Sequence, residues 1–231
     1  MLDFHCHLLV AVDDGPATPE AAFALLDGLK AQGVHELVAT PHRFSPRFSH
    51  VDEAKIAAAW PILQQQALQL GLTVHLGGEN HLSGTMPPLM FAAEAIPLGK
   101  SSCVLVELPD DHLPTRTWET MFALQRAKRR PIIAHPERCK GLHHRDEGLL
   151  SLLSAGGLLQ LTAGNLSGKH GWIMRWRSRR LLNRFPKSCV IASDAHDLGP
   201  RRPAFDQLPH HLQQYRCVDL ASLQQWAGPG N

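Results

Sequence analysis

Short apolar segments recur along the chain and alternate with longer segments of helical periodicity. Continuous apolar runs, rather than alternating ones, are typical of parallel strands covered on both faces. The predicted strands span residues 1–4, 36–40, 73–76, 103–108, 131–134, 158–161 and 189–192. The predicted helices span residues 19–32, 51–70, 88–94, 116–130, 147–155, 173–184 and 220–226.

The first predicted helix shows the clearest boundaries. Thr18 is a suitable N-cap, Pro19 occupies the first helical position, and Gly33 follows the last turn. Alternating strands and helices allow an open doubly wound sheet or a closed barrel. No G-x-G-x-x-G motif follows the first strand, and polar clusters follow nearly every strand instead of one switch point. The sequence therefore predicts an α/β fold, a distorted (β/α)7 TIM-like barrel, in one domain over residues 1–231.

Composition excludes several classes of protein. Hydrophobic residues make up 44% and charged residues 19%, which excludes disordered, collagen-like and coiled-coil chains. The formal net charge of +2 predicts no nucleic-acid partner. We expect no membrane insertion and a cytoplasmic location, because the chain has neither a signal peptide nor a long apolar run. The five cysteines include no C-x-x-C pair and are expected to be reduced thiols.

The 15 histidines are the compositional outlier, and several stand where apolar runs end. His5 and His7 point to one side of the first strand, because strand side chains alternate. This spacing alone is a weak metal signal. Further candidate ligands end or follow the other strands: Asp14, His42, Glu79, Glu107, His135, Asp194 and His196.

A barrel brings all these strand ends to the face where such enzymes carry out chemistry. Imidazoles and carboxylates crowded there need cations between them. Nitrogen and oxygen ligands without sulfur favour manganese, iron or zinc in a multinuclear catalytic site. Three divalent ions would outweigh the four carboxylates and attract a phosphate group, while lowering the pKa of a bridging water. The pattern therefore predicts metal-assisted phosphoester hydrolysis.

Seven segments resemble a known family in order and spacing: DFHCH, VDDGPATPEAA, ATPHR, GGEN, VELPDDHLP, IIAHPER and SDAHDLGPRRP, within residues 1–203. They are similar to the PHP (polymerase and histidinol phosphatase) superfamily, and within it to the CpsB/YwqE-like bacterial protein-tyrosine phosphatases of capsule and exopolysaccharide loci. Glu107, where histidinol phosphatases commonly have histidine, also looks like the tyrosine phosphatase branch.

The resemblance implies a site for three divalent metal ions, Mn²⁺ in particular, with iron or zinc as alternatives. By analogy the first ion would be held by His5, His7, Glu79 and Asp194. The second would be held by Glu79, Glu107 and His135, with Glu79 bridging. The third would be held by Asp14, His42 and His196.

The resemblance also suggests roles in the reaction. Arg138 matches the family's active-site arginine and would neutralise the phosphoryl group. Arg201 or Arg202 would be a second phosphate contact, and the sequence leaves open which. His135 or a metal-bound water would assist the leaving phenolate, and Asp14 is grouped with the catalytic residues.

The implied activity is hydrolysis of phosphotyrosine on a protein, the tail of a tyrosine autokinase of capsule or exopolysaccharide biosynthesis. One alternative is a phosphatase or phosphodiesterase acting on a small molecule such as histidinol phosphate or a nucleotide. Another is a metal-stabilised binding protein that occupies its kinase partner.

Two weaker motifs remain. Residues 139–145 match the C-x5-R pattern of cysteine-dependent tyrosine phosphatases, but Pro136 separates Cys139 from the strand, and Gly141 is the only glycine in the loop.

The basic stretch 169–184 allows docking of an acidic tail, a membrane surface or nucleic acid. A purely structural helix is favoured, with Ile173, Trp176, Leu181 and Leu182 partly inward.

Overall fold

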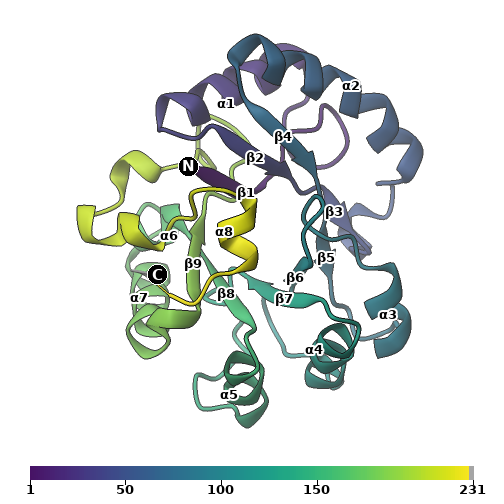
Figure 1. Cartoon of the computed structure of the whole chain (residues 1–231), viewed down its shortest axis with the longest axis vertical. Helices are drawn as coiled ribbons and strands as arrows, with labels where there is room; N and C mark the ends of the chain where they lie inside the picture. Colours follow the sequence, from purple (N-terminus) through teal and green to yellow (C-terminus); the bar gives the residue numbers. More distant parts are fainter. Residues whose placement is uncertain (229–231) are drawn as a thin grey trace.

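The computed structural model describes residues 1–228, and in it a ring of helices surrounds a set of parallel strands (Figure 1). The strands are β1 (Leu2–Cys6), β2 (Glu36–Ala39), β3 (His42–Arg43), β4 (Thr73–Leu76), β5 (Glu79–His81), β6 (Cys103–Glu107), β7 (Arg130–Ala134), β8 (Leu158–Thr162) and β9 (Cys189–Ala192). The α-helices are α1 (Pro19–Ala31), α2 (Glu53–Leu70), α3 (Pro88–Glu94), α4 (Thr117–Arg126), α5 (Glu147–Ser154), α6 (Ala163–Ser167), α7 (Trp172–Arg184) and α8 (Leu220–Gln224). Short 3-10 helices span Pro46–Phe48, Pro186–Ser188, Phe205–Gln207 and His210–Tyr215.

Every predicted strand and helix is present, with ends displaced by a few residues. The last three residues of the predicted domain, 229–231, lie outside the described part of the chain. The N-cap prediction for α1 is confirmed, because Thr18 Oγ1 accepts a hydrogen bond from Ala21 N at 3.3 Å. The helix predicted over residues 116–130 is shorter, since β7 already begins at Arg130.

Two predicted strands continue after a break, and sequence analysis missed the continuations β3 and β5. β2 ends before Thr40 and Pro41, and β4 ends before Gly77 and Gly78. A side chain on Gly77 would place its Cβ 2.9 Å from Val38 Cγ1, so this close approach requires glycine. After the breaks β3 and β5 pair in parallel, with His42 opposite Glu79. The breaks therefore aim these two polar residues at the same place.

The strands form two parallel sheets, ordered β1-β2-β4 and β3-β5-β6-β7-β8-β9. Because β3 continues β2 and β5 continues β4, the chain passes directly from the first sheet into the second at two places. The ring closes between β9 and β1, where Asp194 N donates to His5 O and His7 N donates to Ala195 O, both at 2.8 Å. Between β4 and β6, residues 98–99 make the link, with Gly99 N donating to Leu76 O and Leu98 N to Cys103 O. The predicted distorted (β/α)7 fold is confirmed.

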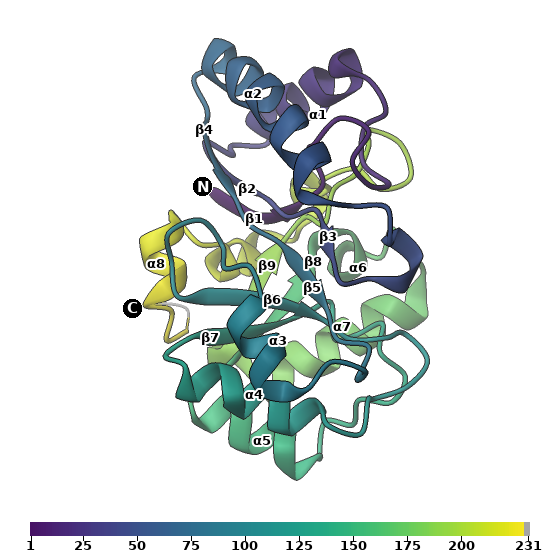
Figure 2. The same ribbon diagram turned by 90° about the vertical axis from the view of Figure 1, so that its right-hand side faces the viewer.

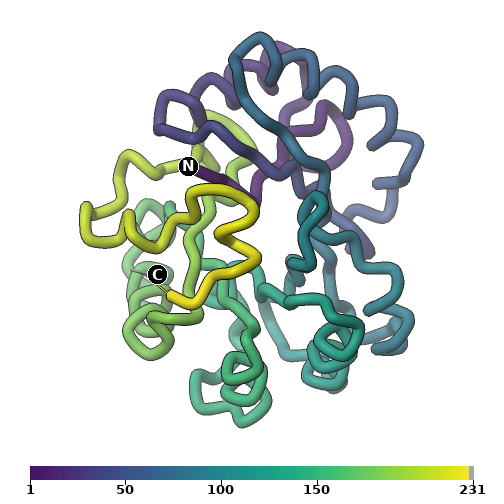
Figure 3. Tube along the Cα trace, in the orientation of Figure 1, coloured from purple at the N-terminus to yellow at the C-terminus, as the bar shows by residue number. Residues whose placement is uncertain are grey.

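Buried apolar side chains occupy two regions. One lies between the strands and the outer helices, and the other fills the inside of the strand ring. The inner region contains Phe4, Leu105, Ile132 and Val190, and Leu223 of α8 joins it. Figure 2 shows α8 and the N-terminus at the amino end of the strands, and the tube in Figure 3 traces the described part of the C-terminal segment across that end. The opposite end is left to the loops that follow the strands.

The structure corrects the inward orientation predicted for part of α7. Leu181 and Leu182 are buried as expected, but Ile173 is 50% exposed and Trp176 is 54% exposed. The helix begins at Trp172, beside the short α6, so its first turn lies at the surface.

Among residues 1–228, no helix combines the length and the apolar content needed to cross a membrane.

Replacing the fully buried Leu223 by alanine removes the α8 side chain from the inner core. We expect Leu223→Ala to lower the free energy of unfolding by about 2–5 kcal/mol, because the deletion leaves a cavity. Urea denaturation measures this change. The matched control is Leu89→Ala on α3, a leucine that is 69% exposed and should cost less than about 0.5 kcal/mol. Equal destabilisation by the two variants would contradict the proposed role of α8.

Candidate metal centre

Nine imidazole and carboxylate side chains meet at the carboxyl ends of the strands. They are the nine ligands predicted from the sequence and form what we call the imidazole–carboxylate cluster: His5, His7, Asp14, His42, Glu79, Glu107, His135, Asp194 and His196. Among residues 1–228 they make four groups in which the potential ligand atoms lie within 4.8 Å of one another. His5 and His7 are fully buried, and the other seven line a cavity of about 280 Å³.

The first group of side chains comes from β1, β5 and the loop after β9. His5 Nε2 lies 3.2 Å from Glu79 Oε1 and 3.3 Å from Asp194 Oδ1. His7 Nε2 lies 3.4 Å from Glu79 Oε2 and 3.7 Å from Asp194 Oδ1. These four residues are those that the family resemblance assigns to the first ion.

The second set shares Glu79 with the first, and His5 and His135 both approach its Oε1. His135 Nε2 lies 2.8 Å from Glu79 Oε1 and 4.0 Å from Glu107 Oε1. Glu79 therefore contacts imidazoles of both sets, although the distances between ligand atoms group His135 with His5 and Asp194, and Glu107 with His42 and Glu79. His42 Nδ1, at 3.1 Å from Glu79 Oε2, also approaches this carboxylate.

The third group lies at the outer edge of the cluster. Asp14 Oδ1 is 3.3 Å from His42 Nε2 and 3.3 Å from His196 Nε2. His7 joins these three residues in one candidate group, because its ligand atom lies within 4.8 Å of theirs, and its ring stacks on His196 with centroids 3.9 Å apart. The third set therefore contains the three residues assigned by resemblance and one more imidazole.

Several buried atoms of the cluster have no hydrogen-bond partner in the protein. These atoms are His5 Nε2, His7 Nε2, Asp14 Oδ1 and His42 Nδ1. A buried polar atom without a partner is costly, and each of these belongs to a candidate ligand group. Imidazole nitrogens and carboxylate oxygens are the donors that Mn²⁺, Fe²⁺ and Zn²⁺ accept. The residues present therefore fit divalent cations.

Residues outside the predicted set hold the imidazoles in place. Gln160 Oε1 lies 2.9 Å from His5 Nδ1 and accepts a hydrogen bond from His135 N at 3.1 Å. Asp13 Oδ2 lies 2.8 Å from His7 Nδ1 and accepts from His42 N at 3.1 Å. Such contacts fix the ring orientation of a metal-binding histidine. Gln160 was missed by sequence analysis, although one polar residue inside an apolar strand was the available signal.

The charges of the cluster stabilise one another. Burial opposes ionisation of Asp194, but the Arg138 guanidinium and the His5 imidazole hold the pKa of its carboxyl well below the usual range. Burial likewise opposes a charge on His7, but Asp13 raises the pKa of that imidazole well above its usual value. The Asp194 carboxylate therefore remains ionised at neutral pH and can bind a cation.

Two members of the cluster have unusual backbone angles. His135 has φ of 28° and Asp194 has φ of 54°, both in the left-handed region. Such conformations cost free energy in residues other than glycine and are common at functional sites. In each case the chain turns sharply after a strand, which directs the side chain into the cluster.

The candidate arginines lie in different places. Arg138 forms an ion pair with Asp194 and lines the cavity. Arg201 Nη1 donates to Asp14 Oδ2 at 2.7 Å and also lines the cavity. Arg202 pairs instead with Asp206 at 3.1 Å and is not among the cavity-lining residues. Of the two candidates left open by the sequence, Arg201 is the one at the cavity.

One wall of the cavity was not predicted. Phe48 stacks on His42 with ring centroids 4.1 Å apart, and Arg47 also lines the cavity. Both belong to the short helix after β3. An aromatic ring and a guanidinium at the rim suit a substrate that carries an aryl group and a negative charge.

The C-x5-R motif does not form a phosphate-binding loop at this cavity. Cys139 is buried, its Sγ donates to His112 O at 3.5 Å, and burial raises the pKa of its thiol. A nucleophilic cysteine requires a lowered pKa. Arg145, the arginine of the motif, is exposed and does not line the cavity of the imidazole–carboxylate cluster.

Known proteins resemble this chain over most of its length. The putative tyrosine-protein phosphatase CapC of Staphylococcus aureus is 32% identical over 209 residues, 90% of this chain and 82% of the relative. The tyrosine-protein phosphatase YwqE of Bacillus subtilis is 28% identical over 87% of this chain and 79% of the relative.

Solved structures point the same way. A structure from work on YwqE of Bacillus subtilis and CpsB of Streptococcus pneumoniae, described as unique metal-dependent tyrosine phosphatases, matches with a TM-score of 0.78 at 28% identity. The match covers 90% of this chain and 84% of that one. A lactonase of Listeria monocytogenes shares only the fold, with a TM-score of 0.51 at 10% identity, covering 89% of this chain and 83% of that one. The family model for capsular polysaccharide synthesis, CpsB/CapC, matches residues 1–221, and the chain belongs to this family.

Proposed function

We propose that this protein is a metal-dependent phosphatase that hydrolyses phosphotyrosine on a protein substrate. The observation that carries the proposal is the imidazole–carboxylate cluster itself, with unpartnered buried ligand atoms and with Arg138 and Arg201 at its cavity. The relatives named tyrosine-protein phosphatases support the choice of phosphotyrosine.

The proposed cofactor is three divalent ions, Mn²⁺ in particular. By the family resemblance, His5, His7, Glu79 and Asp194 would hold one ion, Glu79, Glu107 and His135 a second, and Asp14, His42 and His196 a third, and the distances within each set support this division. Bound ions would neutralise the phosphoryl oxygens and supply a water of lowered pKa as nucleophile.

The chain's own residues position the substrate and balance its charge. Arg138 is tied to Asp194, which leaves its guanidinium fixed at the cavity, where it can donate hydrogen bonds to a phosphoryl group. Arg201, held in place by its hydrogen bonds to Asp14, provides a second hydrogen-bond donor at the cavity. His135 lines the cavity, but an Nε2 that holds the second ion carries no proton, so protonation of the leaving phenolate would fall to a water in the cavity. This help is modest, because a phenol pKa near 10 already makes phenolate a fair leaving group.

The proposed biological partner is a phosphotyrosyl tail of a bacterial tyrosine kinase in capsule or exopolysaccharide biosynthesis. Membership of a capsular polysaccharide synthesis family supports this choice. We also propose that residues 1–231 act as one domain in the cytoplasm, where the five free, buried cysteines would stay reduced.

Removal and return of metal tests the cofactor proposal. Purified protein should contain two to three metal ions per chain, consistent with three sites of unequal affinity. Chelation should abolish hydrolysis of a phosphotyrosyl peptide, and Mn²⁺ should restore it. His135→Ala should lose metal and activity together, as measured by elemental analysis and phosphate release. Activity only on histidinol phosphate or a phosphodiester would instead favour the small-molecule alternative, and metal without turnover would favour a binding protein.

Truncation of the arginines tests their roles. We expect Arg138→Ala to reduce kcat by about 100-fold, because one preorganised donor to the phosphoryl group is lost. Arg201→Ala should raise KM about tenfold, and Arg202→Ala, the matched control, should change neither constant. Steady-state kinetics with a phosphotyrosyl peptide, alongside metal analysis of each variant, provides the measurement. A larger effect of Arg202 than of Arg201 would contradict the assignment.

Substitution of Cys139 tests the mechanism. Cys139→Ser should keep kcat/KM within about twofold, since the thiol is buried and takes no part in the proposed reaction. Thermal unfolding of the same variant controls for damage to the fold. A variant that folds normally but loses all turnover would support a cysteine nucleophile instead.

A further inference from the structure

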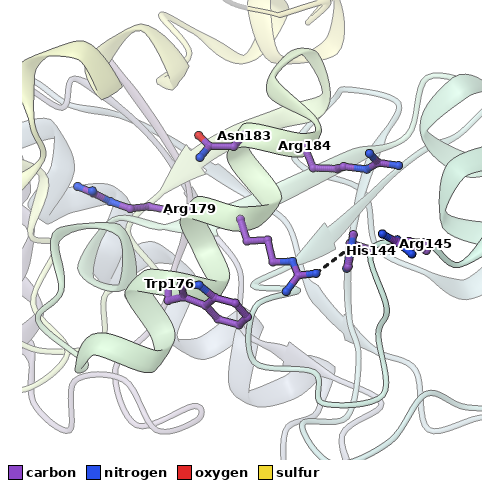
Figure 4. A pocket seen from close by; sticks show the side chains of 7 residues that line it. His144, Arg145, Trp176, Arg179, Asn183 and Arg184 are labelled. Carbon is purple, nitrogen blue, oxygen red and sulfur yellow. Dashed lines mark hydrogen bonds between the residues drawn. The ribbon is translucent and has the colours of Figure 1, made fainter.

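A basic groove lies on the surface of the molecule between α7 and the loop after β7. Its volume is about 460 Å³. Figure 4 shows Trp176, Asn183 and Arg184 on α7, with His144 and Arg145 on the facing loop. We call it the α7 groove, and its lining residues are His144, Arg145, Trp176, Arg179, Arg180, Asn183 and Arg184.

The positive charge of the α7 groove is not neutralised by the protein. Four arginines and no acidic residue line it, although the whole chain has a net charge of only +2. Within residues 1–228, the arginines that form ion pairs lie elsewhere: Arg43, Arg116, Arg138, Arg201 and Arg202. Asp146, adjacent in sequence to Arg145, is used as the N-cap of α5 and accepts hydrogen bonds from Gly148 N and Leu149 N. The groove therefore attracts an anionic ligand.

An aromatic side chain stands beside this charge. Trp176 is 54% exposed, and the Arg180 guanidinium carbon lies 5.1 Å from its ring centroid. Arg180 Nη2 also donates to His144 Nε2 at 3.0 Å, which keeps that imidazole neutral. Partial desolvation and the neighbouring Arg180 and Arg145 guanidinium groups lower the pKa of His144 accordingly. A ring face next to guanidinium groups is suited to an aryl phosphate, because the ring stacks and the phosphate takes paired hydrogen bonds.

The α7 groove continues towards the segment that carries Arg138. A second hollow of about 210 Å³ shares Trp176, His144 and Arg180 with it and extends to Pro136 and Glu137. Across this hollow, Arg177 Nη2 donates to Cys139 O at 2.6 Å, which fastens α7 to the chain next to Arg138. The second hollow therefore ends beside the loop from which Arg138 enters the cavity of the imidazole–carboxylate cluster, although the two cavities share no lining residue.

We propose that the α7 groove binds a second phosphotyrosine of the same substrate segment whose other phosphotyrosine is presented to the metal cavity. This inference rests on the proposed function. A concave groove that ends in a narrow hollow fits one extended acidic chain with aryl phosphate side chains. Because Trp176, Arg180 and Arg184 are themselves exposed, an anionic bilayer is the alternative that the vesicle experiment below tests.

Direct binding tests the groove without requiring turnover. The probe is a fluorescent peptide with several non-hydrolysable phosphonate analogues of phosphotyrosine, added to metal-loaded protein and followed by fluorescence anisotropy. We expect the double variant R145E/R180E to bind at least about tenfold more weakly than wild type, because two charge-assisted contacts become repulsive. Trp176→Ala should also weaken binding, through loss of stacking.

Matched controls separate local from general charge effects. The variant K30E/K55E reverses two exposed lysines on α1 and α2 and changes the net charge by the same amount, so its peptide affinity should match wild type. A small aryl phosphate should be hydrolysed with unchanged kcat/KM by R145E/R180E, because this substrate cannot reach both sites. Equal weakening by the two double variants would overturn the proposal.

The remaining outcomes distinguish this proposal from its alternatives. Unchanged peptide binding by R145E/R180E, together with lost sedimentation on vesicles of phosphatidylcholine and phosphatidylglycerol, would overturn it in favour of a membrane surface. Peptide binding that depends on Arg145 and Arg180 in a protein without phosphotyrosine hydrolysis would support the groove while contradicting the proposed function. If R145E/R180E hydrolysed the multiply phosphorylated peptide normally and with unchanged KM, the proposed role of the α7 groove would be contradicted, and the proposed phosphatase function would stand.

Discussion

The buried carboxylate of Glu79 is the charge around which the site is arranged. Its oxygens lie between 2.8 and 3.4 Å from nitrogens of four histidines. These are His5 in β1, His7 just after β1, His42 in β3 and His135 just after β7. Burial opposes ionisation of this carboxyl, but His5 and His42 lower its pKa well below the usual range. A negative charge at this depth is stable only with positive charge around it. The cluster is thus built to contain cations.

Much of the surrounding structure keeps that arrangement in place. Gln160 and Asp13 fix three of the imidazole-bearing segments, and the left-handed backbone at His135 and Asp194 turns two side chains inward. The apolar interior of the strand ring, joined by α8, lies at the other end of the strands. Stability and chemistry are therefore supplied by opposite ends of the same strands, as in other α/β barrels.

Recognition of substrate depends on where the positive charge is placed rather than on how much there is. The chain is almost neutral, yet Arg138 and Arg201 are held at the metal cavity by Asp194 and Asp14. The α7 groove collects further arginines without acidic partners. A phosphorylated acidic segment would be attracted to both places.

The sequence by itself determined the alternating strands and helices and the nine members of the cluster, because apolar runs and the polar residues that end them are local features. It did not determine β3 and β5, since two or three polar residues after a glycine or proline carry no strand signal. The choice between Arg201 and Arg202, the support from Gln160, and the exposure of Trp176 were decided only by tertiary structure. Each depends on which distant segments the closed ring of strands brings together, and the spacing of residues within one segment does not determine those contacts.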